Sequence, residues 1–162
     1  MSDPIIHKDF ENKTVVIEKT FAAPRSKVWR AYTDETLLIK WWGPKTWPAS
    51  SKSFDFRPGG HWHYYMTGPD GTEAWGQIHY IEIMPEDYFT AIDEFSDPEG
   101  NKNDSLPTNN WRTEFIDEGE TTKVITTLTF TSSENMQTLV DMWFESGYSD
   151  ALDNLDTLLE TL

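Results

Sequence analysis

Acid–base chemistry in this chain could come from tyrosine hydroxyls and from carboxyl groups that reach an apolar interior. A phenol hydroxyl can polarise a carbonyl group, and the candidates are Tyr64, Tyr80 and Tyr148. A carboxylate can act as a base where burial raises its pKa, and the candidates are Asp93, Glu114 and Glu145. For each carboxylate a solvated surface position is the simpler interpretation, because Asp and Glu are usually exposed.

Motifs of nucleophilic and nucleotide-dependent catalysis are absent from the sequence. It has no GxSxG, no GxxxxGK[ST] or GxGxxG loop, no HExxH and no EF-hand spacing. The absence of cysteine excludes thiolate metal sites and cysteine nucleophiles. We therefore expect no cofactor, and the sequence does not decide whether the protein is an enzyme or which residues would be catalytic.

Three histidines could bind a divalent transition metal if their imidazoles converge. His61, His63 and His79 all point to one face of the sheet in the register argued below. Histidines without a ligand are the simpler interpretation, because no carboxylate is obviously placed to orient them. We expect no metal site.

The elements that must position these side chains begin with a strand and two short helices. Alternation of β-branched and polar residues over 14–21 predicts a strand. Pro24 is typical of a first helical turn. Asp34 is typical of the N-cap of a second short helix, which ends at Gly43 and Pro44.

Residues 53–130 alternate strand patterns with turn sequences at 57–60, 68–71, 84–87 and 117–120, which predicts an antiparallel meander. Segment 96–110 is polar and predicts a mobile surface loop, with a lid as the alternative. Apolar residues at i, i+3 and i+4 from 133 to 162 predict one long helix. Residues 1–12 are assigned to an N-terminal extension and residues 13–162 to one domain.

The turn at 68–71 allows a trial register for the strands beside it, because directly opposed residues share a face. The register that sets large side chains against small ones pairs Met66 with Ala74, Tyr64 with Gly76 and Trp62 with Ile78. Five residues then face the long helix, namely Trp62, Tyr64, Met66, Ile78 and Tyr80. His61, His63, Tyr65, Trp75 and His79 lie on the opposite face, with His61 beside His79.

The order of elements and several short motifs resemble the SRPBCC (START-like, helix-grip) superfamily, and within it the activator of heat-shock-protein-90 ATPase homologue-like branch. The motifs are Ala23-Pro24, Val28-Trp29-Arg30-Ala31, Trp41-Trp42-Gly43-Pro44, Asp55-Phe56-Arg57-Pro58-Gly59-Gly60 and Gly68-Pro69-Asp70-Gly71. The resemblance implies an α+β helix-grip fold, in which a curved antiparallel sheet and two short helices wrap around a long C-terminal helix.

The resemblance also implies a cavity between the sheet and the last helix. We expect it to be lined by Trp41, Trp62, Tyr64, Met66, Ile78, Tyr80, Phe115, Trp143, Gly147 and Tyr148. Members of this branch often have Gly-Trp where this chain has Gly147-Tyr148. Gly147 costs about 1 kcal/mol of helix propensity against Ala, and close helix-to-sheet packing is a simpler explanation for it than direct ligand contact.

Composition limits the partners. Thirteen Lys and Arg against 28 Asp and Glu give a net charge of -15, which disfavours nucleic acid and anionic lipid surfaces. No segment has the ~20 apolar residues that span a bilayer, and no signal peptide is evident, so we expect a cytoplasmic protein without membrane insertion. A homodimer is compatible with the sequence.

Three functions stay open. The first is binding of a small hydrophobic ligand, such as a lipid, a sterol or a polyketide-like molecule, in the internal cavity. The second is a cyclase or hydrolase type of enzyme that acts on such a ligand, which predicts an ionisable side chain of shifted pKa inside the cavity. The third, an interaction module that activates a chaperone ATPase, rests only on the family name.

Overall fold

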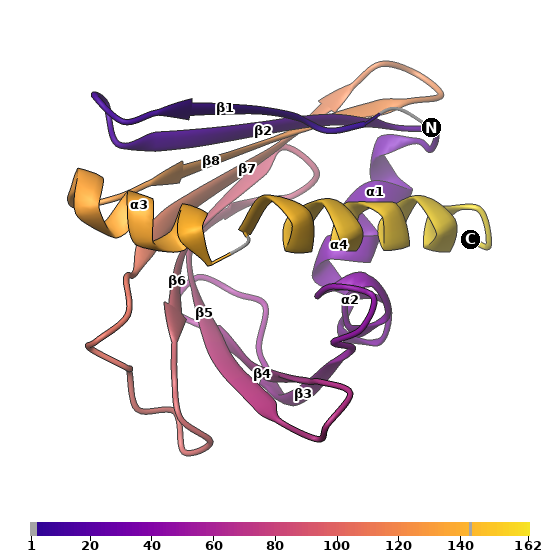
Figure 1. Cartoon of the computed structure of the whole chain (residues 1–162). Coiled ribbons are helices and arrows are strands. Elements are labelled where there is room, and N and C mark those ends of the chain that lie inside the picture. Colours follow the sequence, from indigo (N-terminus) through magenta and orange to yellow (C-terminus); the bar gives the residue numbers. More distant parts are fainter. Residues whose placement is uncertain (1–2, 143) are drawn as a thin grey trace.

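An antiparallel sheet, with eight strands among the described residues, forms the body of the molecule (Figure 1). The structure, a computed structural model, describes residues 3–142 and 144–162, except the side chains of residues 144 and 145. The strand order is β1-β2-β8-β7-β6-β5-β4-β3. The strands are β1 Ile5–Asp9, β2 Thr14–Phe21, β3 Ala49–Phe54, β4 His61–Thr67, β5 Glu73–Met84, β6 Tyr88–Phe95, β7 Asn109–Asp117 and β8 Thr122–Thr129.

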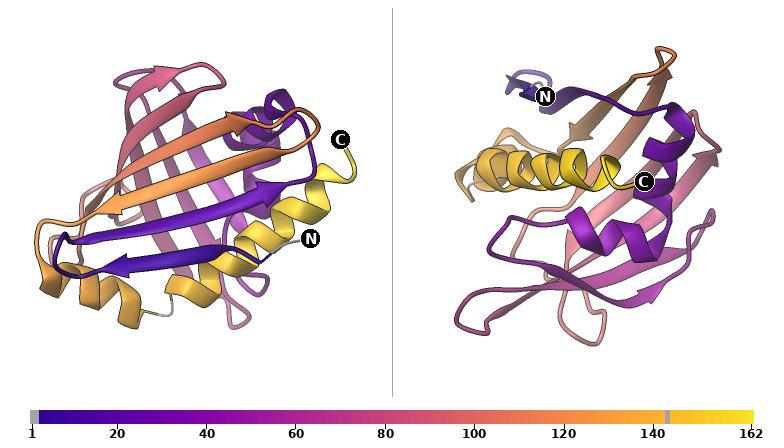
Figure 2. Two further views of the ribbon diagram at one scale, coloured as in Figure 1. Left: turned by 90° about the horizontal axis from the view of Figure 1, so that it is seen from above. Right: turned by 90° about the vertical axis from the view of Figure 1, so that its right-hand side faces the viewer.

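In the part of the chain that the structure describes, four helices lie on one side of this curved sheet, which we call its inner face (Figures 1 and 2). They are α1 Arg25–Thr33, α2 Glu35–Trp41, α3 Ser133–Asp141 and α4 Phe144–Leu159. Asp34 is the N-cap of α2, as predicted, because its side chain accepts a hydrogen bond from the Thr36 backbone N–H at 2.9 Å. The short helices α1 and α2 close one end of the sheet (Figure 2).

The prediction of one continuous helix over residues 133–162 is wrong. Helix α3 ends at Asp141, and Met142 caps it with a ψ angle of 30°. The apolar spacing continues from α3 into α4, since both helices turn an apolar side toward the sheet. Hydrophobic periodicity reports which side of a helix is buried, and therefore does not reveal a change in the helix axis.

Segment 1–12, which we assigned to an extension, contributes strand β1 to the sheet. Ile5 to Asp9 pair in antiparallel register with Thr14 to Glu18 of β2. Four of the five β1 residues are exposed. An exposed edge strand lacks the alternation of buried and polar residues that marks a strand in sequence.

The predicted β4–β5 register is confirmed. Met66 pairs with Ala74, Tyr64 with Gly76, Trp62 with Ile78, and His61 with His79. The turn between them closes with hydrogen bonds from Gly68 N–H to the Thr72 carbonyl and from Gly71 N–H to the Gly68 carbonyl. A Cβ atom added to Gly76 would lie 2.9 Å from the Tyr64 hydroxyl oxygen, so the tyrosine ring covers a position that only glycine leaves open.

The core lies between the inner face and the helices. Strands β2 and β8 alternate buried and partly exposed residues along their length, as half-buried strands do. A cluster of edge-to-face aromatic rings around Trp29, Tyr32 and Phe115 fills the end of the core under α1. Helix α4 is held to β2 by an ion pair between Lys19 Nζ and Asp156 Oδ2 at 2.8 Å, with both side chains buried.

Segment 96–110 packs on the outer face of the sheet. His63 Nε2 lies 3.0 Å from the Asp97 carbonyl oxygen, and Gln77 Nε2 donates to the Gly100 carbonyl at 3.0 Å. The Asp97 side chain also accepts hydrogen bonds from the backbone N–H groups of Glu99 and Asn101. These contacts tie the segment to the face opposite the helices.

Candidate ligand-binding cavity

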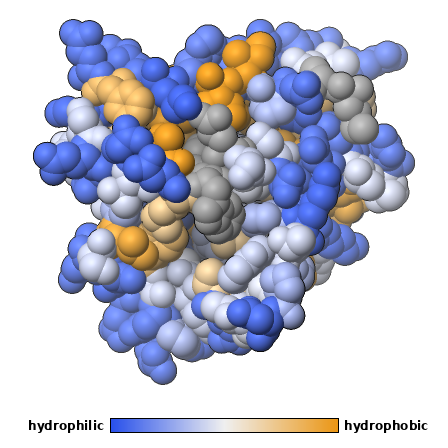
Figure 3. All heavy atoms as spheres, in the orientation of Figure 1, coloured by the Kyte–Doolittle hydropathy of each residue, from blue (hydrophilic) through white to orange (hydrophobic). Residues whose placement is uncertain are grey.

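A cavity of about 230 Å³ lies between the inner face and the two C-terminal helices. Its walls come from the end of α2, from strands β4 to β7 and from α3 and α4. The lining residues are Trp42, Gly43, Pro44, Tyr64, Met66, Ala74, Trp75, Gly76, Asp93, Glu94, Phe95, Trp111, Leu139, Met142, Gly147, Tyr148 and Ala151. On the face of the molecule that Figure 3 shows, hydrophilic side chains predominate, with a few apolar side chains among them.

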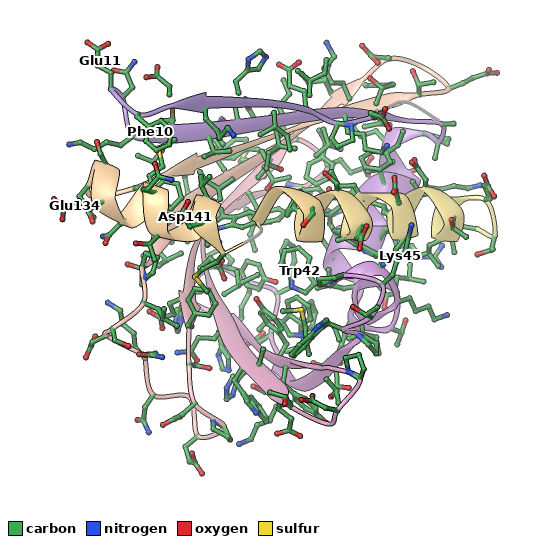
Figure 4. All side chains as sticks on the ribbon, in the orientation of Figure 1. Phe10, Glu11, Trp42, Lys45, Glu134 and Asp141 are labelled. Carbon is green, nitrogen blue, oxygen red and sulfur yellow. The ribbon has the colours of Figure 1, made fainter. Side chains whose placement is uncertain are left out.

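Trp42 forms the centre of the apolar wall. It follows α2 directly and lies between α4 and the sheet (Figure 4). Its ring centroid lies 5.6 Å from that of Trp62, 6.0 Å from Trp111 and 6.3 Å from Tyr148. Gly43, with a φ of +96°, then turns the chain away, and a side chain there would meet the Trp47 carbonyl oxygen at 2.6 Å.

Asp93 places a carboxyl group in this apolar surrounding. It lies on β6 opposite Ile78 of β5 and is half-buried. Burial, together with the negative charge of Glu94, raises the pKa of the Asp93 carboxyl to about 7. The Trp111 indole N–H lowers this pKa, although it lacks the geometry of a full hydrogen bond and has no other partner among the described residues.

Two tyrosine hydroxyls share the cavity with Asp93. Burial raises the pKa of Tyr64 well above its ordinary value, and the nearby Asp93 charge adds to the shift. Burial raises the pKa of Tyr148 to about 12, and the neighbouring side chains of Thr126 and Tyr32 act in the opposite direction and lower it. Both phenols are therefore neutral at physiological pH and can donate hydrogen bonds.

The predicted lining residues fall into four groups in the structure. Tyr64, Met66, Gly147 and Tyr148 line the cavity. Trp62, Ile78 and Tyr80 line a separate space of about 20 Å³ deeper between the sheet and α2, which has room for little more than one water molecule. Trp41 and Phe115 are fully buried and line neither space. Trp143 lies outside the described residues, as does the side chain of Glu145.

Trp42 lines the cavity where the sequence pattern favoured Trp41. The Trp41 indole N–H donates to the Ala31 carbonyl at 2.9 Å, which fixes its ring against α1. Residue 42 comes after the last helical residue and is free to point toward the sheet. The Gly43-Pro44 sequence could have indicated the position of Trp42, because it marks where the helix ends and the chain changes direction.

The histidines on the outer face are engaged in other contacts. His79 Nε2 lies 2.7 Å from Glu94 Oε1, which also accepts from Gln77 Nε2. The rings of His61 and His79 are 6.4 Å apart, whereas His63 contacts segment 96–110. In the part of the chain that the structure describes, no three His, Asp or Glu side chains are grouped to hold a metal ion.

Of the other candidate bases, Glu114 lies outside the cavity. Its carboxylate pairs with Arg112 at 3.3 Å in a partly exposed position on β7. The structure thus gathers one of the three predicted carboxyl groups, Asp93, with two of the three predicted phenols, Tyr64 and Tyr148.

The protein is of the α+β class. Its curved antiparallel sheet has helices on the inner face, and a cavity lies between the sheet and these helices. Residues 22–160 match the family model described as Activator of Hsp90 ATPase homolog 1-like protein, and the chain belongs to this family. Within the described residues, no helix has both the length and the apolar character that crossing a membrane requires.

Solved structures of bacterial proteins share the fold over nearly the whole chain. A protein from Arthrobacter aurescens is 34% identical with a TM-score of 0.92, and the match covers 98% of this chain and 92% of that one. Protein Ms6760 from Mycobacterium smegmatis is 33% identical with a TM-score of 0.90, covering 98% and 97%. A protein from Staphylococcus epidermidis is 27% identical with a TM-score of 0.84, covering 96% and 93%. No curated protein matches the sequence.

Proposed function

We propose that this protein binds a small, largely apolar molecule in the cavity between the inner face and helices α3 and α4. The observation that supports the proposal most strongly is the cavity itself, which has about 230 Å³ of space lined mainly by aromatic and aliphatic side chains. A cavity of ~150 Å³ with apolar walls is enough to bind benzene. This space therefore favours a molecule of one or two rings over a sterol.

Binding can be measured with the tryptophans of the cavity wall as reporters. Titration with indane, naphthalene and a long-chain alcohol should change the intrinsic fluorescence, because Trp42 and Trp111 line the site. Bound ligand should also raise the melting temperature, since it binds only the folded state.

An obstructing variant tests whether the cavity is the site. Ala74 lines it from β5, and Ala74→Phe would place a ring in the space that the ligand needs. Thr129→Phe adds the same ring at an exposed position of β8 and serves as the control. We expect Ala74→Phe to abolish binding and Thr129→Phe to retain it. Equal binding by both variants, or no binding of any probe by the natural protein, would refute the proposal.

Proton transfer in the same cavity is a second candidate function, and the observation that favours it is Asp93 beside two phenols. A carboxyl group with a pKa of about 7 can accept a proton from a bound substrate near neutral pH. The probe 5-nitrobenzisoxazole, whose ring opens when a base removes its C–H proton, has a size that suits the cavity. We expect turnover with a pH midpoint near 7 and its loss in Asp93→Asn. Turnover equal to that of free carboxylate in solution would exclude this function.

A further inference from the structure

The cavity carries an acidic group and no basic one. Among its described lining residues are two carboxyl-bearing side chains and no Lys, Arg or His. One of these carboxyls, that of Glu94, is turned to the outer face, where it contacts Gln77 and His79. The described lining thus offers a ligand the Asp93 carboxyl, together with the hydroxyls of Tyr64 and Tyr148.

Among the residues that the structure describes, the Asp93 carboxyl has no cationic partner. None of the ion pairs among the described residues includes it. A carboxylate in apolar surroundings is costly unless a cation or hydrogen-bond donors compensate its charge. A buried indole N–H without a full hydrogen bond, that of Trp111, lies beside it. Among its described lining residues, the site therefore has no positive charge to compensate the Asp93 carboxylate.

Aromatic rings surround the same space. The ring centroid of Trp42 lies 6.1 Å from that of Tyr64, 6.0 Å from Trp111 and 6.3 Å from Tyr148, and Trp111 and Tyr148 are 5.7 Å apart. The faces of such rings attract organic cations, most strongly where water is excluded. Carboxylate and aromatic rings together form the usual protein environment of an ammonium group.

We propose that the ligand of this cavity is an organic amine, with its protonated nitrogen against the Asp93 carboxylate and its apolar body between Trp42, Trp111 and the α3–α4 end of the site. This inference rests on the proposed function and specifies its ligand class. A carboxylate or phosphate ligand is disfavoured, because it would meet Asp93 without a compensating cation and would approach a protein of net charge -15.

Three probes with the same ring system show how the polar substituent alone affects the binding affinity. They are 2-aminoindane, 2-indanol and indane-2-carboxylate, which differ in one substituent on the same two-ring body. We expect calorimetric titration at pH 8 to give the amine at least tenfold higher affinity than the alcohol, and no measurable binding of the carboxylate. If indane-2-carboxylate binds as tightly as 2-aminoindane, the inference is wrong.

Asp93→Asn tests the assigned contact, because the amide keeps the shape of the side chain and removes its charge. The variant should lose the preference for 2-aminoindane over 2-indanol. Glu114→Gln makes the same change outside the cavity and should keep the tenfold preference. If the preference for the amine persists in Asp93→Asn, it arises from the overall negative charge of the protein, and the proposed contact with Asp93 is wrong.

The pH dependence of the natural protein gives a test that needs no variant. The Asp93 carboxyl, with a pKa of about 7, is about one tenth ionised at pH 6 and nine tenths at pH 8, whereas an alkyl amine stays protonated at both. The neighbouring phenols of Tyr64 and Tyr148 do not titrate in this range. The adjacent Glu94 carboxyl is turned to the outer face, where it contacts Gln77 and His79. Amine affinity should therefore rise about tenfold from pH 6 to pH 8, and 2-indanol affinity should not.

The outcomes distinguish the two proposals. If 2-indanol binds and 2-aminoindane binds no better, the cavity is a ligand site and the amine inference is wrong. If none of the three probes binds at millimolar concentration, the proposed function fails together with the inference.

Discussion

At the residue scale, the cavity combines groups that work against the stability of the fold. Asp93 is a carboxyl group surrounded by aromatic rings, and nothing in the packing of β6 requires an acid opposite Ile78. Glycine at position 76 weakens the strand, but it leaves the space in which the Tyr64 ring lies. Such local costs are expected where a surface is shaped for a ligand.

Asp93 should make stability fall as the pH rises. Its pKa is about 7 in the folded protein and about 4 in an unfolded chain, so the folded state holds the proton more tightly. The stabilisation from this proton is complete below pH 4 and is lost as the pH rises through 7. Between pH 5 and pH 8 the natural protein should lose about 2–3 kcal/mol more of its unfolding free energy than Asp93→Asn, measured by urea titration. Identical pH slopes for the two proteins would contradict the raised pKa.

Gly76→Ala should disturb the cavity through Tyr64. The new methyl group would lie 2.9 Å from the Tyr64 hydroxyl oxygen and 3.0 Å from its Cζ, so the ring must move. We expect a loss of about 1–3 kcal/mol in thermal unfolding. Adding Tyr64→Phe removes one of the two clashing atoms and should restore part of the loss. If the losses in stability from the two substitutions simply add, the new methyl group at position 76 does not contact the Tyr64 hydroxyl.

At the element scale, the sequence predicted what depends on side-chain size and periodicity. The β4–β5 register followed from three pairs of large and small residues around the turn at 68–71. The break between α3 and α4 did not, because the apolar face continues across it. Strand β1 was missed because it is an exposed edge, and Trp42 was missed because its direction is set at a helix end and not by helical periodicity.

The position of α4 on the sheet should depend on its buried ion pair with β2. Asp156→Ala would leave the Lys19 ammonium buried, at 1% side-chain exposure, without this carboxylate. We expect a loss of about 3–5 kcal/mol in chemical unfolding. The double variant Lys19→Met, Asp156→Leu replaces both charges by apolar groups and should recover most of that loss. A double variant as unstable as Asp156→Ala would mean that packing volume, and not charge, decides the effect.

At the scale of the whole molecule, the family and the α+β class followed from the order of motifs, whereas the shape of the cavity did not. Sequence patterning assigned Trp62, Ile78 and Tyr80 to the helix-facing side of the sheet, and that side also lines the narrow space under α2. Whether a face packs solidly or leaves room depends on how far the helices stand from the sheet. That distance arises from contacts among many residues, and no local pattern records it.

The surplus of acidic residues should make the protein more stable in salt. With 28 Asp and Glu against 13 Lys and Arg, the folded chain concentrates a net charge of -15 on a small surface, and unfolding relieves the repulsion. Salt screens this repulsion, since the screening length falls from about 30 Å at 0.01 M to about 8 Å at 0.15 M. Salt also weakens exposed ion pairs such as Arg57–Asp55 and Lys45–Asp153, but each contributes only about 0–1 kcal/mol.

We therefore expect the melting temperature to rise by several degrees from 10 to 300 mM NaCl, mostly below 150 mM. Sucrose at equal osmolality should not reproduce this saturating profile, and a melting temperature that falls with salt would show that ion pairs outweigh the repulsion.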